Sequence, residues 1–203
     1  MSKLKKFKSF ILNKKKNVIN KNGKRNIFCY DGGYLNLSQT STLTLNGYYG
    51  LCCDNPNKYQ AGITLKGNAT MTVDGKFKQY FNSNIFVERN ATLSIGEDCF
   101  INSGTTINCY NEIKIGNRVC IANNVSIRDS DFHHLDYKGY EISKPIEIGD
   151  DVWICDDVTI LKGVKIGSGS VIGAKSLVNR DVPENCLVAG NPAKVIKTDI
   201  KWH

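Results

Sequence analysis

The sequence predicts an all-β fold in which short strands stack as successive coils around one core. Between residues 148 and 183 an aliphatic residue recurs every six positions, and a small or β-branched residue follows it four places later. The pairs are Ile148/Val152, Ile154/Val158, Ile160/Val164, Ile166/Ser170, Ile172/Ser176 and Val178/Val182. A fixed period of this kind indicates a repeat architecture, because no single short strand can bury its apolar face alone.

Each hexapeptide is interpreted as a short strand with both ends facing the core, since residues four apart in an extended chain share a face. Glycine follows the aliphatic residue at Gly149, Gly167 and Gly173. We expect a corner of the coil at each of these glycines or at a neighbouring polar residue, and glycine suits such a corner because it reaches positive φ without steric cost.

The periodic segment has an earlier counterpart and one long interruption. Residues 95–127 repeat the same phase, and residues 26–94 show alternating apolar segments with Gly and Asn turns but less regular spacing. We therefore expect one coiled domain over residues 26–197, with irregular coils first and regular coils over 95–127 and 148–182. Residues 128–147 break the period. Because a rigid repeat carries function on its loops, they are the predicted active-site loop.

The two ends of the chain differ from the coil. Residues 1–25 hold ten Lys or Arg and no acidic residue. Their apolar residues follow a roughly helical spacing at Leu4, Phe7, Phe10 and Ile11. Two interpretations of this arm stay open: a helix that caps the coil, or a basic amphipathic helix that lies on an anionic membrane surface or an acidic glycan. Residues 198–203 are predicted to form a tail.

The net charge of +8 comes from the N-terminal arm. Without residues 1–25 the chain has 17 basic and 19 acidic residues, a net charge of −2. A nucleic-acid-binding domain normally carries its own basic face, so we expect no nucleic-acid partner. The apolar run in the arm is too short for a signal peptide, and no run approaches the roughly 18 residues of a membrane span. We therefore expect a cytoplasmic protein, with the arm as a route to the inner face of the membrane.

The cysteine pattern agrees with that compartment. Eight cysteines occur without a CxxC pair, and Cys99 falls where the period places a small inward residue. Buried thiols behave as small hydrophobic groups. The cysteines are therefore predicted to be reduced and structural, as in cytosolic proteins.

A set of motifs fills the second half of the chain: IGDDVWI at 148–154, GVKIG at 163–167, VIGA at 171–174, RDVP at 180–183 and GNPAK at 190–194. Together they resemble the hexapeptide-repeat acyltransferases, in particular the maltose, galactoside and capsular-polysaccharide O-acetyltransferases. The resemblance is strong from about residue 95 to residue 197 and weak before that.

The resemblance implies a left-handed parallel β-helix with about 18 residues per coil, although parallel crossovers are normally right-handed. It also implies a homotrimer that binds acetyl-CoA, the acyl donor, between neighbouring subunits and requires no metal. The implied activity is transfer of an acetyl group to a hydroxyl of a sugar or polysaccharide acceptor.

Three other functions are considered as alternatives. One is N-acetylation of an amino sugar, and a second is a non-catalytic β-helix with a binding or structural role. The third is the zinc hydratase branch of the same fold, which needs three histidines from separated coils. The chain has only the adjacent His133 and His134 and the terminal His203, which disfavours this branch.

The resemblance places the catalytic histidine in the loop before a Pro-Ile-x-Ile-Gly segment, found here at residues 145–149. It thus assigns the general base to His133, with His134 as a second candidate or a substrate contact. An imidazole can take a proton from an attacking hydroxyl at neutral pH, so the hydroxyl attacks the thioester directly. Asp131 shares a face with His133 in an extended chain, so it either orients the ring or is a solvated loop acid.

Further residues are assigned by the resemblance outside the loop. Asn102 aligns with an asparagine that contacts the acceptor sugar, or it serves a corner turn. For cofactor binding the assigned residues are Trp153, Gly173, Ala174, Arg180 and Lys194. The tryptophan would line the pantetheine arm, the two small residues would allow close approach, and the two cations would meet CoA phosphates. Packing at a coil edge and solvated surface charge are the alternatives for the tryptophan and the cations.

Overall fold

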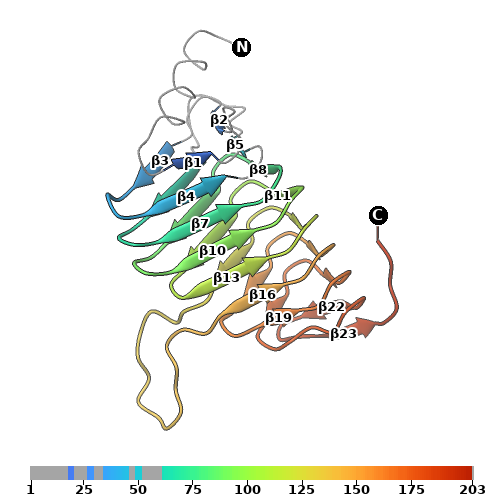
Figure 1. The fold of residues 1–203 in the computed structure, drawn as a ribbon. Coiled ribbons are helices and arrows are strands. Elements are labelled where there is room, and N and C mark those ends of the chain that lie inside the picture. The colour runs from blue at the N-terminus through green and yellow to red at the C-terminus, as the bar shows by residue number, and fades with distance from the viewer. Residues whose placement is uncertain (1–17, 21–26, 30–33, 46–48, 52–60, 203) are drawn as a thin grey trace.

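The computed structural model describes residues 18–20, 27–29, 34–45, 49–51 and 61–202. Its strands form three sheets, called A, B and C, and the chain passes through them in that order on each coil (Figure 1). A strand therefore pairs with the strand of the next coil and not with its neighbour in sequence. The turns between the sheets are called the A–B, B–C and C–A corners.

Sheet A contains β1 (Val18–Asn20), β4 (Thr42–Leu45), β7 (Thr70–Val73), β10 (Thr92–Ile95), β13 (Glu112–Ile115), β16 (Ile146–Ile148) and β19 (Lys165–Ile166). Sheet B contains β2 (Ile27–Cys29), β5 (Tyr49–Leu51), β8 (Phe77–Gln79), β11 (Cys99–Ile101), β14 (Cys120–Ile121), β17 (Trp153–Ile154), β20 (Val171–Ile172), β22 (Leu187–Gly190) and β23 (Ala193–Lys197). Sheet C contains β3 (Tyr34–Leu37), β6 (Gly62–Leu65), β9 (Asn84–Val87), β12 (Thr106–Cys109), β15 (Ser126–Arg128), β18 (Thr159–Ile160) and β21 (Leu177–Val178).

Successive coils pair in parallel, and β23 then turns back to pair antiparallel with β22. Within the described residues, no helix has the length and apolar character that a membrane span requires.

The inward positions of the six-residue period form the core, as predicted. Both members of all six pairs between Ile148 and Val182 are buried. Paired positions lie 22 residues apart in the upper coils, as between Ile63 and Ile85, and 18 apart in the lower coils, as between Ile160 and Val178. The upper coils therefore have the longer strands, and the lower coils keep the strict hexapeptide spacing.

The corners differ from the prediction in two respects. The inward pair of a hexapeptide lies on either side of a corner, because Ile148 ends β16 and Val152 comes just before β17. The predicted glycines are also not the residues with left-handed φ. That conformation recurs two positions later, at Asp151, Asp157, Gly163, Gly169 and Lys175.

Gly149 is needed for space rather than for its backbone conformation. A Cβ atom at this position would lie 2.7 Å from the backbone nitrogen of Ser168 in the next coil. The close stacking of coils therefore excludes a side chain at this corner, which is why the sequence shows glycine there.

Both predicted ends are partly built into the coil. Residues 18–20, which belong to the predicted arm, form β1 and pair with β4, whereas the predicted helix lies outside the described residues. At the other end, the indole Nε1 of Trp202 donates a hydrogen bond to the carbonyl oxygen of Asp151 at 2.7 Å. The last described residues thus pack along the A–B corner instead of extending as a tail.

The described cysteine side chains fit the predicted structural role. They are free thiols at Cys99, Cys109, Cys120, Cys155 and Cys186. Burial raises the pKa of Cys99 to about 11, which keeps this thiol protonated at neutral pH. The prediction for the other three cysteines lies outside the described side chains.

Candidate active site

The interruption at residues 128–147 leaves the C–A corner as a projecting hairpin, seen at the lower left of Figure 1. Ser130 and Ser143 form an isolated antiparallel bridge at its base. The amide of Asp131 donates to the carbonyl of Ile142 at 2.9 Å, and the amide of Lys144 donates to the carbonyl of Asp129 at 2.9 Å. The predicted active-site loop is therefore a closed hairpin that leaves and re-enters the coil at one point.

A buried carboxylate joins this hairpin to the coil above it. Asp129 is 0% exposed, and its side chain accepts hydrogen bonds from the amides of Tyr110 at 2.7 Å and Asn111 at 2.8 Å. Burial raises the pKa of Asp129, and the hydrogen bonds from the Tyr110 and Asn111 amides partly oppose that rise. Sequence reasoning missed this residue. The available signal was the two-residue insertion at 110–111, which breaks the period one coil above the loop.

Inside the hairpin, Tyr140 contacts several other residues of the same segment. Its hydroxyl lies 2.8 Å from Oδ2 of Asp131 and 2.8 Å from the backbone oxygen of His133, so it can donate to either acceptor. Its ring also makes edge contacts with the rings of His134 and Tyr137, at centroid distances of 5.3 and 5.0 Å.

Lys162, at the C–A corner of the next coil, contacts both Asp131 and the Tyr140 ring. Its Nζ lies 2.5 Å from Oδ2 of Asp131, 2.5 Å from the backbone oxygen of Glu141 and 4.2 Å from the centroid of the Tyr140 ring. Hydrogen bonding to Lys162 is the main cause that holds the pKa of Asp131 below its usual range. Asp131 therefore stays ionised at neutral pH.

His133 and His134 are both exposed on the hairpin. Asp131 comes two residues before His133, and its carboxylate contacts Lys162 and Tyr140. Tyr140 connects the Asp131 carboxylate to His133, because the Tyr140 hydroxyl also lies within hydrogen-bond distance of the His133 backbone oxygen. Orientation of the imidazole ring by Asp131 stays a prediction.

An aromatic row leads from the hairpin along the outer side of sheet C. The ring of Phe132 packs edge-on against Tyr110 at 4.6 Å, and Tyr110 lies 5.9 Å from Phe86 in the coil above. A cation lies near each end, with Arg128 at 5.7 Å from the Phe132 ring and Lys66 at 4.8 Å from the Phe86 ring. The row begins next to His133 and spans three coils.

Three of the cofactor and acceptor candidates lie at the other edge of sheet C. Asn102 follows β11 at the B–C corner, where its backbone takes part in the turn through Thr105. Gly173 and Ala174 follow β20 at the same corner. A Cβ atom at Gly173 would lie 2.9 Å from Cβ of Ala189, so packing of the next coil already requires a small residue there. The cofactor role of Gly173 stays a prediction.

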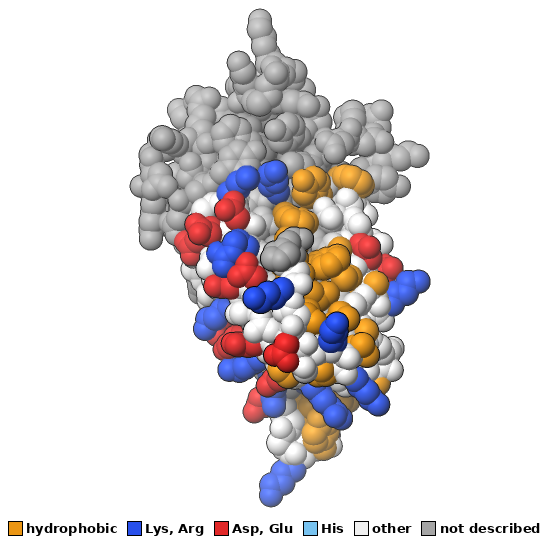
Figure 2. Space-filling view, turned by 90° about the vertical axis from the view of Figure 1, so that its right-hand side faces the viewer, with side chains coloured by type: hydrophobic (Ala, Val, Ile, Leu, Met, Phe, Trp, Pro, Cys, Tyr) orange, Lys and Arg blue, Asp and Glu red, His pale blue; other side chains and the backbone are white. Residues whose placement is uncertain are grey.

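Trp153 lies on the outer face of sheet B and is 41% exposed. It stacks in register with Cys120, which in turn pairs with Phe100, and its ring lies 5.9 Å from that of Trp202. Figure 2 views this side of the molecule and shows hydrophobic side chains gathered in an elongated patch between charged ones. The surface offers an apolar strip of the kind that a pantetheine arm could follow.

The two basic residues predicted to bind the CoA phosphates lie in different parts of the fold. Lys194 is exposed on β23, on the same sheet as Trp153. Arg180 is exposed after β21, at the C–A corner on the side of the hairpin. Within one chain, the hairpin histidines are therefore on the opposite edge of sheet C from Gly173 and Ala174, while Trp153 and Lys194 are on sheet B.

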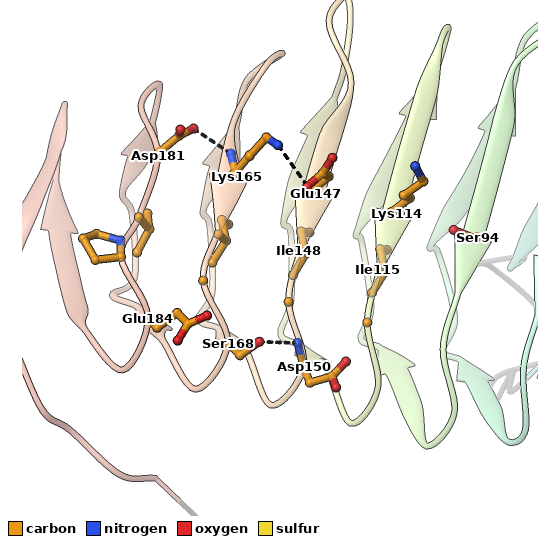
Figure 3. A pocket seen from close by; sticks show the side chains of 16 residues that line it. Ser94, Lys114, Ile115, Glu147, Ile148, Asp150, Lys165, Ser168, Asp181 and Glu184 are labelled. Atoms are coloured by element: carbon orange, nitrogen blue, oxygen red, sulfur yellow. Dashed lines mark hydrogen bonds and ion pairs between the residues drawn. The ribbon is translucent and has the colours of Figure 1, made fainter.

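A cavity of about 730 Å³ lies on the far edge of sheet A from the hairpin (Figure 3). Its wall carries a row of alternating charge in which Nζ of Lys165 lies 3.3 Å from Glu147, and the Lys165 amide donates to Asp181 at 2.8 Å. The charges of Lys165 and Glu147 are thus paired with each other, and none of the residues assigned from the sequence lines the cavity. It is a groove of the coil surface and not part of the candidate site.

A second cavity of about 540 Å³ lies between the A–B corner and the C-terminal segment. Trp202 and Lys201 form one wall. On the other wall Arg118 makes a paired contact with Asp151, with nitrogen–oxygen distances of 2.6 and 2.7 Å. In the described part of the chain, no group of three His, Cys, Asp or Glu is placed to hold a metal ion.

Comparison with known proteins identifies the family. The family model described as "Bacterial transferase hexapeptide (six repeats)" matches residues 145–180. The structure of the polySia-specific acetyltransferase NeuO superposes with a TM-score of 0.67 at 28% identity, covering 89% of this chain and 90% of that one. The chain belongs to the hexapeptide-repeat acyltransferases. The predicted left-handed parallel β-helix is confirmed.

Two further relatives widen the comparison. A curated relative from Klebsiella pneumoniae, an uncharacterized 24.8 kDa protein in the cps region, is 37% identical over 150 residues. These residues are 68% of this chain and 66% of that relative, so the chain spans about two thirds of its length. A mutant of AntD, an N-acyltransferase from Bacillus cereus, shares the fold, with a TM-score of 0.58 at 16% identity over 92% of this chain and 84% of that one.

Proposed function

We propose that this hexapeptide-repeat acyltransferase transfers an acetyl group from acetyl-CoA to a hydroxyl of a polysaccharide, with His133 as general base. The observation that carries the proposal is the hairpin. It presents His133 in solvent on a loop held in place by Asp129 and Lys162. NeuO, whose structure matches nine tenths of this chain, is named as acting on a polysialic acid.

The chemistry needs one base and no acyl-enzyme intermediate. The imidazole of His133 accepts the proton of the acceptor hydroxyl while its oxygen attacks the thioester carbonyl. A carbon–oxygen bond forms, the carbon–sulfur bond breaks, and the CoA thiolate leaves. The proton taken by the imidazole then neutralises that thiolate, which returns the base to its starting form.

The donor site is proposed to lie between two protomers of a homotrimer. In one chain, His133 is at the C–A corner, whereas Trp153 and Ala174 are on sheet B and the B–C corner. A neighbouring copy could bring its own sheet B edge to this hairpin, and a cyclic trimer repeats such a cleft three times. Light scattering tests the assembly, and a monomer at micromolar concentration would contradict the shared site.

The acceptor is proposed to follow the row formed by Phe132, Tyr110 and Phe86. Aromatic rings bury the apolar faces of ligands, and Arg128 and Lys66 add positive charge near the two ends. A row that spans three coils suits a chain of sugars better than a single sugar. We therefore expect KM to fall as the acceptor is lengthened from a monosaccharide to an oligomer.

The deciding experiment measures CoA release from acetyl-CoA against neutral, acidic and amino-sugar acceptors, each as monomer and polymer. Ester formation on a polymer hydroxyl supports the proposal. Amide formation on an amino sugar would favour the N-acetyl alternative, and no turnover with any acceptor would favour a non-catalytic coil. Loss of activity with a chelator would contradict the metal-free mechanism.

A further inference from the structure

Between residues 131 and 142, the outer part of the hairpin, every residue but one is exposed. Residues 131–139 are all exposed, whereas Tyr140 is half-buried against Lys162. An exposed twelve-residue loop normally samples many conformations, because ordering each residue costs about 1–2 kcal/mol of conformational entropy. The contacts of Tyr140, together with the packing of Phe132 on Tyr110, therefore limit the conformations of the tip.

These contacts reach the main chain at the candidate base. The Tyr140 hydroxyl is 2.8 Å from the backbone oxygen of His133 and 2.8 Å from the Asp131 carboxylate. That carboxylate is in turn held by Lys162 from the next coil. A chain of contacts thus runs from a rigid corner of the β-helix to the residue whose side chain must meet the substrate.

We propose that Tyr140 is a positioning residue for His133, and that Lys162 and Asp131 act through it. The inference rests on the proposed function, since it assumes that His133 is the base. A base must lie within hydrogen-bond reach of the proton that it takes. Misplacing a reacting group by about 1 Å can cost on the order of 100-fold in rate. Holding the main chain of His133 is therefore a direct contribution to turnover.

The test removes one oxygen atom. Tyr140→Phe keeps the ring, with its contacts to Lys162 and His134, and deletes the hydroxyl that reaches His133. We expect kcat to fall about 10- to 100-fold, with KM for acetyl-CoA unchanged. Tyr137→Phe is the matched control, because it deletes a hydroxyl from a tyrosine of the same hairpin that is 61% exposed. The control should keep the wild-type kcat.

A double-mutant cycle separates positioning from a general structural effect. If Tyr140 acts through His133, then Tyr140→Phe should change kcat by less than about 3-fold in the His133→Ala background. An equal loss in both backgrounds would overturn the proposal and leave His133 as the base. If His133→Ala were as active as wild type, the proposed function would fail instead, and the positioning role with it.

A second measurement does not depend on activity. The Asp131 amide is hydrogen-bonded to Ile142 across the base of the hairpin. Hydrogen exchange over residues 131–135 should speed up in Tyr140→Phe and stay unchanged in Tyr137→Phe, with the coils equally protected in both. Identical exchange in wild type and Tyr140→Phe would overturn the positioning role.

Discussion

The two edges of sheet A belong to the same repeat, but only one of them accommodates inserted residues. At the A–B corner, Gly96, Gly116, Gly149 and Gly167 follow the neighbouring strands β10, β13, β16 and β19. There the next coil fills the place of a side chain. At the C–A corner, the chain inserts two residues at 110–111 and the whole hairpin of 128–147. The comparison indicates that the coil carries insertions at the C–A corner, where the proposed base lies, and close-packed glycines at the A–B corner.

The largest expected effect concerns the chemistry of the C–A corner. His133→Ala should lower kcat by about 10²–10⁴, equivalent to roughly 3–5 kcal/mol of transition-state stabilisation. Steady-state kinetics with a fixed acceptor measures this loss, and thermal unfolding should be unchanged because His133 is exposed. His134→Ala should cost far less, so the reverse ranking would move the base by one residue.

A substitution at the A–B corner should instead lower the stability of the fold. Gly149→Ala forces a Cβ atom to within 2.7 Å of the Ser168 backbone nitrogen, so the coils must separate. We expect a loss of about 1–3 kcal/mol in the free energy of unfolding, as for other overpacked sites. Gly67→Ala at the C–A corner is the control, because its Cβ would meet the flexible end of Arg89 at 3.3 Å. Equal destabilisation of the two variants in denaturant titrations would remove the contrast between the corners.

Substitutions of Asp129 test how the C–A corner is joined to the coil. Asp129→Ala removes the acceptor of the Tyr110 and Asn111 amides, and an unsatisfied buried donor costs about 1–3 kcal/mol. Chemical denaturation should show this loss, and Asp129→Asn should recover part of it, since one side-chain oxygen remains. A variant as stable as wild type would mean that water replaces the carboxylate.

The smallest expected effect is an acid sensitivity of the hairpin. The folded pKa of Asp131 lies below its unfolded value, so its stabilising contribution is complete above the usual carboxyl pKa of about 3.9 and is lost as pH falls through the folded value. The pair with Lys162 is partly exposed, which limits the effect to about 0.2–1 kcal/mol. Proteolysis of the hairpin should accelerate below about pH 4 in wild type and less in Asp131→Asn. The same acceleration in both would assign the acid response to another group.

The sequence was enough to predict the core, because burial at Ile148, Ile154 and their repeats follows directly from a fixed period. It was not enough to explain the corners. Gly149 is consistent both with a left-handed turn and with close stacking of coils, and only the position of the next coil separates the two. The handedness of the coil likewise came from resemblance and not from spacing.

The site was predictable only in part for the same reason. His133 stands out by its residue type in a polar loop. Asp129 and Tyr140 do not, since an acid and a tyrosine in such a loop usually face solvent. Their importance depends on partners far away in sequence or across the hairpin, namely the amides at 110–111 and the backbone oxygen of His133.

The closure of the hairpin at its base has a consequence for how acceptor specificity can change. Since Lys144 returns to hydrogen-bond Asp129, the two ends of the segment are already joined whatever lies between them. Doubling the length of a flexible loop costs only about 0.6 kcal/mol in closure entropy. Residues 131–142 can therefore change in length around His133 without refolding the scaffold, and such changes would alter the surface that the proposed acceptor meets.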